Sequence, residues 1–88
     1  MRVKEGFVLH TVCDENLVVP IGKATEEFHG MIRLNDTGAF LWKLMDSEFS
    51  KETLVTALLS EYDVEQKEAQ DTVEAFLNNL IENGIIQK

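Results

Sequence analysis

The chain has 88 residues, of which 44% are hydrophobic and 27% are charged. We therefore expect one domain, spanning residues 1–88, with a modest core. Sixteen acidic residues against eight basic ones give a net charge of −8, which argues against nucleic acid and against an anionic membrane surface as partners. Because there is no apolar run long enough to span a membrane, no evident signal peptide and a single cysteine, we expect a reduced, cytoplasmic setting.

The acidity is concentrated in the C-terminal part of the chain. Residues 1–35 carry four basic and five acidic side chains, a net charge of −1. Residues 36–88 carry four basic and eleven acidic side chains, a net charge of −7.

The first third of the chain predicts a β-hairpin. Residues 7–12 are rich in β-branched and aromatic side chains, and the turn-forming residues 13–16 separate them from a second apolar run at residues 17–21. Such runs around a short polar turn are typical of paired antiparallel strands. Pro20 has no amide hydrogen to donate, so it is expected at a strand end, a bulge or a free edge.

A third strand is predicted after a polar connection at residues 23–27. It runs from Phe28 to Leu34, and alternation places Ile32 and Leu34 on one face with Met31 and Arg33 on the other. The three strands together predict an antiparallel meander with one face to bury.

The next helix is predicted to begin at Asn35 or Asp36, both good capping residues, and to continue to about Asp46. Its inward stripe comprises Phe40, Leu41, Leu44 and Met45. Trp42 lies beside this stripe, and two placements are open for it, in the core or facing a partner.

Two further helices follow. Ser50 is expected to cap the second, with Phe49 and Leu54 as a hydrophobic staple, and its buried side chains are predicted to be Leu54, Val55, Leu58, Leu59 and Tyr62. The third is predicted over residues 64–83, with Asp63 and Gln66 at capping-box spacing, and Gly84 and Ile85 ending it as a Schellman motif. The fold class is therefore α+β, a three-stranded antiparallel sheet followed by three α-helices (βββααα).

Catalytic and metal-binding patterns are weak. His10 and Cys13 are close in sequence, but Asp14 and Glu15 give the thiol an acidic setting instead of the electropositive one that a reactive thiolate needs. The candidate ligands His10, Cys13 and His29 lack the paired spacing of zinc sites, and the acids of the third helix lack a calcium-binding loop. We expect no catalytic residue, no metal site and no cofactor in this chain.

One stretch resembles the signature of the PqqD-like family, the recognition elements for precursors of ribosomally made, modified peptides. The stretch is Leu34-Asn35-Asp36-Thr37-Gly38-Ala39-Phe40-Leu41-Trp42-Lys43-Leu44-Met45-Asp46. The family pattern continues with Tyr62, with Asp71-Thr72-Val73 and with Leu77 to Ile85, so the resemblance covers about Phe7 to Ile86. It is a resemblance to the family and assigns no pathway. The motif residues themselves are interpreted as folding residues that cap and pack the first helix.

The resemblance implies a winged helix-turn-helix-like domain that is not an enzyme. Such a domain binds the leader of a precursor peptide as an added strand along the third strand, beside the third helix, and presents it to a modifying enzyme such as a radical S-adenosylmethionine (SAM) protein. Strand addition takes its affinity from unpaired backbone groups. The implied contacts are His29, Met31, Ile32, Arg33 and Leu34 on the strand, and Asp71, Glu74, Ala75 and Asn78 on the helix. Because that helix is acidic, we expect a leader that carries Lys or Arg.

Two other functions are compatible with the same architecture. A DNA-binding winged helix is one, although both candidate recognition helices are net acidic. A regulatory subunit without a peptide ligand is the other. The free edge of the third strand could also pair two copies of the chain into a homodimer.

Overall fold

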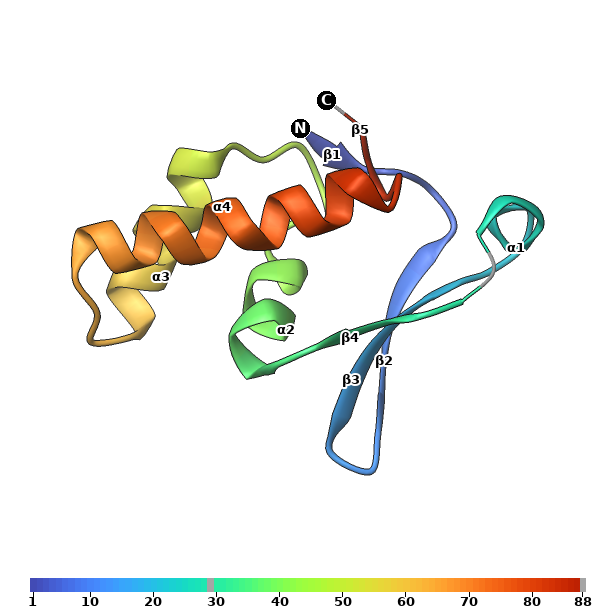
Figure 1. Ribbon diagram of the computed structural model, residues 1–88, viewed down its shortest axis with the longest axis horizontal. Coiled ribbons are helices and arrows are strands. Elements are labelled where there is room, and N and C mark those ends of the chain that lie inside the picture. The colour runs from blue at the N-terminus through green and yellow to red at the C-terminus, as the bar shows by residue number, and fades with distance from the viewer. Residues whose placement is uncertain (29, 88) are drawn as a thin grey trace.

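The computed structural model describes residues 1–28 and 30–87 and contains two small antiparallel sheets and a group of helices (Figure 1). Sheet order is β2-β3-β4 in the larger sheet and β1-β5 in the smaller one, which joins the two ends of the described chain. The predicted order of three strands followed by three helices is confirmed, with α1 and the β1-β5 pair as additions. The elements are β1 (Arg2–Val3), β2 (Phe7–Val12), β3 (Glu15–Pro20), α1 (Ala24–Glu27), β4 (Ile32–Leu34), α2 (Asp36–Lys43), α3 (Lys51–Glu61), α4 (Gln66–Glu82) and β5 (Ile86–Gln87).

The β2-β3 hairpin projects away from the helices and ends in a two-residue turn, Cys13-Asp14 (Figure 1). Both turn residues have positive φ, +50° and +66°, as a type I′ turn requires. Strand pairing is in register from Phe7 opposite Pro20 to Val12 opposite Glu15. Pro20 therefore sits at the strand end, as predicted.

This turn gives a prediction about stability. Asn-Gly is the preferred type I′ pair, because glycine and asparagine tolerate positive φ better than other residues. The double change Cys13→Asn and Asp14→Gly is therefore expected to raise the free energy of unfolding by about 0.5–1 kcal/mol. Urea denaturation followed by circular dichroism measures the effect. A midpoint that falls would contradict the turn assignment.

The segment before β4 differs from the prediction. Residues 23–27 were expected as a polar connection, but Ala24–Glu27 forms the single helical turn α1, and Phe28 N–H donates to the Ala24 carbonyl at 2.9 Å. Phe28 packs its ring edge-to-face on Phe7, with the centroids 5.5 Å apart. Among the described residues the third strand is shorter than predicted and pairs with β3 over Ile32–Leu34.

Helix α2 begins as predicted and ends earlier. The Asn35 side chain accepts a hydrogen bond from the Gly38 amide at 2.8 Å and so caps the helix. The last helical residue is Lys43, not a residue near Asp46. Leu44 was predicted to be buried, but the early end turns it outward to 39% exposure, and the following Met45 enters the core instead.

Helix α3 is capped by Ser50, whose hydroxyl accepts from the Thr53 amide at 3.2 Å, and the staple residues Phe49 and Leu54 are both buried. These predictions are confirmed. Leu59, expected inside, is 37% exposed because it lies on the flank of the helix away from the core. Tyr62 is half-buried and packs edge-to-face on Phe40.

Helix α4 starts two residues later than predicted, at Gln66. Asp63 does not cap it, because Val64 packs against the core and keeps the chain extended as far as Glu65. The C-terminal prediction is confirmed. Gly84 has φ +75°, its amide donates to the Ile81 carbonyl at 3.0 Å, and the Ile85 amide donates to the Leu80 carbonyl at 2.9 Å, which is the Schellman pattern.

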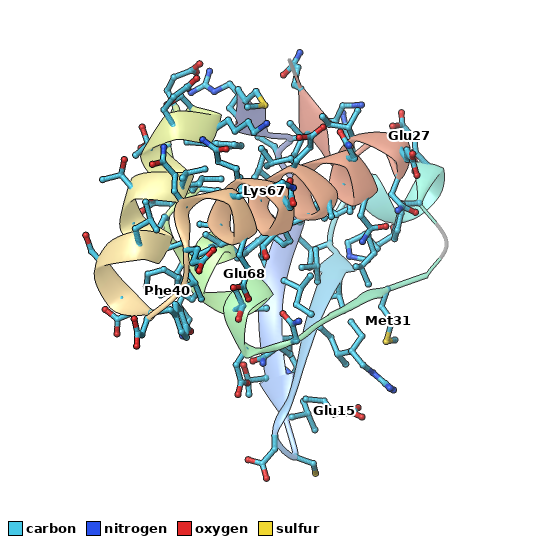
Figure 2. All side chains as sticks on the ribbon, turned by 60° about the vertical axis from the view of Figure 1, so that its left-hand side comes forward. Glu15, Glu27, Met31, Phe40, Lys67 and Glu68 are labelled. Carbon is cyan, nitrogen blue, oxygen red and sulfur yellow. The ribbon has the colours of Figure 1, made fainter. Side chains whose placement is uncertain are left out.

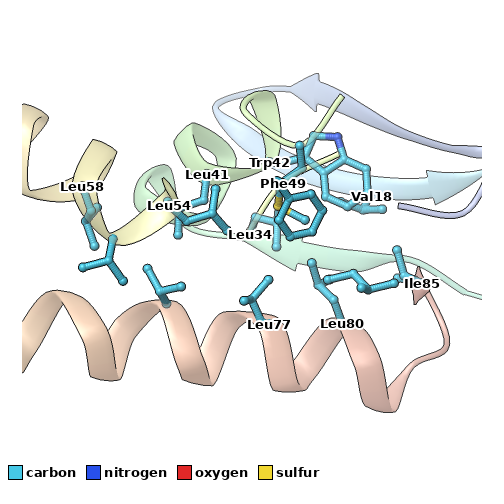
Figure 3. Close-up of a cluster of buried hydrophobic side chains, with 14 of the residues drawn as sticks. Val18, Leu34, Leu41, Trp42, Phe49, Leu54, Leu58, Leu77, Leu80 and Ile85 are labelled. Atoms are coloured by element: carbon cyan, nitrogen blue, oxygen red, sulfur yellow. The ribbon is translucent and has the colours of Figure 1, made fainter. Parts of the chain in front are cut away.

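One apolar cluster joins the inner face of the sheet to the three long helices (Figure 3). The sheet contributes Val18 and Leu34, and β5 and its approach contribute Ile85 and Ile86. Trp42 is 9% exposed and belongs to this cluster, so its placement is in the core and not on a partner-facing surface. The remaining buried members are Leu41, Met45, Phe49, Leu54, Val55, Leu58, Ala69, Val73, Leu77 and Leu80.

Candidate functional site

The outer edge of β4 is an open strand edge. In the described residues β4 pairs with β3 on one side only. A two-residue hairpin closes on a hydrogen-bonded pair, and such pairs alternate with non-hydrogen-bonded ones along an antiparallel ladder. Counting from Val12 opposite Glu15, Leu17 forms its backbone hydrogen bonds with His10 of β2. Its backbone groups are therefore directed away from β4, and Leu17 opposite Arg33 is a non-hydrogen-bonded pair. The backbone N–H and C=O of Arg33 therefore point away from β3, toward the free edge.

A groove runs beside this edge, between β4, the start of α2 and one face of α4. Its volume is about 400 Å³. The α4 wall shows helical spacing, with Thr72, Ala75, Phe76 and Asn79 on one face. The other lining residues are Arg33, Leu34, Asn35, Thr37, Gly38 and Leu41.

Gly38 is one of the residues that line the groove. A Cβ at this position would lie 3.2 Å from the Leu34 Cβ and 3.4 Å from the Phe76 Cε1. The absence of a side chain lets the first turn of α2 pack closely against β4 and α4. The motif glycine is thus a packing residue, as interpreted from the sequence, and it also shapes the groove.

The floor and the helical wall are mostly uncharged. Among the described residues that line the groove, Arg33 is the one that carries a charge, and its guanidinium lies 3.3 Å from the Glu15 carboxylate. Both side chains are well exposed to solvent, so this ion pair is weak. The groove thus offers a nearly uncharged surface of mixed polar and apolar side chains, with backbone groups along one side.

The structure brings together some of the residues predicted to bind peptide. Arg33, Leu34 and Ala75 line the groove. Ile32 and Leu34 turn their side chains toward the core. Met31 is 61% exposed and projects from the segment that leads into β4, away from α4 (Figure 2). His29 lies outside the described residues.

The other three predicted helix residues, Asp71, Glu74 and Asn78, are not part of the groove lining. Glu74 reaches across to α3, where its carboxylate lies 3.1 Å from the Lys51 ammonium. Asp71 pairs with Lys67 at 2.9 Å and raises the pKa of that lysine through the hydrogen bond and its charge. Both acids are therefore partly neutralised by a lysine of the same chain.

The prediction missed much of the helical wall and the α2 start. Thr72, Phe76 and Asn79 were not named as peptide contacts, and the motif residues Asn35 and Thr37 were interpreted as folding residues only. The available signal was the spacing of Thr72, Ala75 and Asn79 along one flank of the buried stripe of α4. That spacing marks one flank of α4, but the residues on the other side of the buried stripe show the same spacing, so the sequence does not say which flank faces β4.

The fold and the groove define a class of protein: a small α+β domain that presents an open strand edge beside a helix. The chain belongs to the PqqD family, described as "Coenzyme PQQ synthesis protein D (PqqD)", whose model matches residues 16–86. A comparison with curated proteins finds no match. No helix in the described part of the chain is both long and apolar enough to cross a membrane.

Two solved structures share the fold. One is described as "TbiB1 in Complex with the TbiA(beta) Leader Peptide" and has a TM-score of 0.78 at 20% identity, covering 99% of this chain and 95% of that chain. The other, "Lasso peptide synthetase B1 complexed with the leader peptide", has a TM-score of 0.76 at 23% identity, covering 99% of this chain and 96% of that chain.

Proposed function

We propose that this protein recognises the leader of a ribosomally made precursor peptide and takes it up as an additional strand beside β4. The observation that carries the proposal is the outward-facing backbone of Arg33 next to a groove walled by α4. Membership of the PqqD family supports it, as do two solved structures of the same fold that are complexed with leader peptides.

The binding mode follows from the strand geometry. We take the leader strand to run antiparallel to β4. A leader residue opposite Arg33 would then exchange two backbone hydrogen bonds with it, each contributing about 0.5–1.5 kcal/mol. The residues on either side of it would direct their side chains toward the groove, because successive side chains alternate between the faces of a sheet. Backbone pairing then supplies affinity and the groove supplies selectivity.

The proposed contact set differs from the one inferred from sequence. On the strand side it keeps Met31, Ile32, Arg33 and Leu34. On the helix side it consists of Thr72, Ala75, Phe76 and Asn79, in place of Asp71, Glu74 and Asn78. Asp71 and Glu74 are each paired with a lysine and lie outside the groove lining, so these two acids do not support the expectation of a leader that carries Lys or Arg.

In the proposed role the protein is a carrier and not a catalyst. It would present the bound precursor to a separate modifying enzyme, such as a radical SAM protein, in the cytoplasm, and that enzyme would bring its own cofactors. The described residues contain no group of three or more His, Cys, Asp or Glu side chains arranged to hold a metal ion.

Calorimetric titration tests the function directly. The ligand is the synthetic leader of a short precursor peptide, to be sought among the genes that neighbour the gene of this protein, and the control is the same leader with its sequence scrambled. Binding of the native leader with a clear preference over the scrambled one supports the proposal. Equal heats for the two peptides would overturn it.

Blocking the groove is expected to abolish this preference. Ala75 is exposed in the groove wall, so Ala75→Arg places a long side chain where the leader would pack, and we expect at least about tenfold weaker binding. Asn78→Arg is the matched control, because it adds the same side chain to the same helix outside the groove lining. If Asn78→Arg weakens binding as much as Ala75→Arg, the groove is not where the leader lies.

A further inference from the structure

A second pocket, the α1 pocket, lies between α1 and the C-terminal end of α4. Its volume is about 370 Å³. Its aromatic part consists of Phe7 and Phe28, which are half-buried and pack edge-to-face with their ring centroids 5.5 Å apart. The remaining lining residues are Lys4, Glu5, Lys23, Ala24, Glu27, Asn83 and Gly84. Among the described residues, the lining of this pocket and the lining of the groove have no member in common.

One face of α4 connects the groove to the α1 pocket. Thr72, Ala75, Phe76 and Asn79 line the groove, and Asn83 lines the α1 pocket. Their i, i+3, i+4, i+7, i+11 spacing puts all of them on the same helix face. The Asn83 side-chain amide donates to the Asn79 side-chain oxygen at 3.2 Å and to the Asn79 backbone carbonyl at 2.7 Å. The α1 pocket therefore continues the groove toward the C-terminal end of α4.

A leader bound beside β4 would extend toward the α1 pocket. In Figure 1, β4 runs from the side of α1 to the start of α2, and the C-terminal end of α4 lies toward α1. A leader strand antiparallel to β4 runs the opposite way, so its C-terminal continuation passes α1.

The distance between the two sites sets the spacing of the leader residues that reach them. Asn83 lies about 12 Å beyond Ala75 along the axis of α4. An extended chain covers this distance with about four residues. Because every second side chain of a strand shares a face, a residue four positions further along is directed to the same side as the first. One leader can therefore place one side chain in the groove and another in the α1 pocket.

We infer that the leader carries a second anchor, an apolar side chain about four residues C-terminal to the residue in the groove, and that this anchor occupies the α1 pocket. The inference rests on the proposed peptide recognition and extends it to a further part of the leader. The two lysines and two glutamates of the lining offset each other in charge. The Phe7 and Phe28 rings are then the groups that select the side chain, and they favour an apolar one.

Calorimetric titration of the whole chain with a nested set of leaders tests the inference. The probes are the synthetic leader named above and versions of it shortened one residue at a time from the C-terminal end. The affinity is expected to fall in two steps. The first, about tenfold, comes when the second anchor is removed, and the second comes about four residues further on, when the residue in the groove is removed. Changing the anchor to serine in the uncut leader is expected to reproduce the first step.

A blocked α1 pocket is expected to remove the first step. Asn83 is exposed, so Asn83→Arg places a long side chain at the pocket. We expect about tenfold weaker binding of the uncut leader and no change for the leader that lacks the anchor. Asn78→Arg is the matched control, because it makes the same change on the same helix and lines neither the groove nor the α1 pocket. It is expected to keep both steps, and circular dichroism checks that both variants are folded.

Three results would overturn the inference and leave recognition in the groove standing. They are a single step in the truncation series, a first step caused by a charged residue, and a first step that Asn83→Arg does not reduce more than Asn78→Arg does. A leader that binds no better than its scrambled form would overturn the proposed function and this inference together. The two failures are therefore distinguished by the scrambled control.

Discussion

Arg33→Pro is expected to weaken leader binding by at least about tenfold while the domain stays folded. Proline lacks the amide hydrogen that Arg33 directs toward the free edge of β4. In a bound leader the carbonyl facing this position would lose its partner, at a cost of about 1–3 kcal/mol for an unsatisfied buried acceptor. The pyrrolidine ring would also occupy space that the added strand needs.

The fold should tolerate this change because β3 does not use the backbone of Arg33. The two strands bond through Asn16 with Leu34 and through Val18 with Ile32, by the alternation that starts at the hairpin turn. Proline is found at the edges of sheets for the same reason. The Arg33 side chain is 72% exposed and contacts Glu15 in a weak surface ion pair, so its loss is expected to change stability by less than about 1 kcal/mol.

Arg33→Ala is the control, since it removes the same side chain and keeps the amide. It is expected to bind leader within about threefold of the wild type. Calorimetric titration of both variants with the same leader separates backbone pairing from side-chain contact. If the alanine variant loses as much affinity as the proline variant, the guanidinium and not the strand edge holds the peptide, and strand addition at β4 is wrong.

Local signals predicted those parts of the fold that depend on neighbouring residues. The caps at Asn35 and Ser50 and the glycine ending at Gly84 each involve residues within a few positions of one another, and all three are as expected. The predicted start of α4 was wrong because the packing of Val64 on the core determines where the helix begins. Such a contact joins distant parts of the chain and leaves no trace in local spacing.

The candidate site was likewise predicted where neighbouring residues decide the structure, and not where long-range packing decides it. The edge strand follows from the alternation of Met31, Ile32, Arg33 and Leu34, and was predicted apart from its length. Most of the α4 residues that line the groove were not predicted, because α4 has two flanks beside its buried stripe and either of them could face β4. Glu74 lies on the flank that meets Lys51 of α3, and Ala75 lies on the flank that meets β4. Which flank faces α3 and which faces β4 depends on the direction in which the helices cross, and local sequence spacing does not give that direction.

Trp42→Ala is expected to produce the largest loss of stability, about 3–5 kcal/mol. The indole is 9% exposed and belongs to the cluster that joins sheet and helices, so its removal leaves a cavity between them. A domain of this size has roughly 5–10 kcal/mol of stability in total. The variant is therefore expected to lose between about a third and all of its stability.

Urea denaturation followed by far-ultraviolet circular dichroism measures this loss, since the substitution removes the one tryptophan of the chain and with it the fluorescence signal. Trp42→Phe should cost less, because it keeps an aromatic ring in the same space. Leu44→Ala, at a 39% exposed position two residues further on, is the control and is expected to cost no more than about 0.5 kcal/mol. A Trp42→Ala variant as stable as this control would mean that the indole faces a partner. In that case the substitution would weaken binding of the leader or of the modifying enzyme and would leave the unfolding midpoint unchanged.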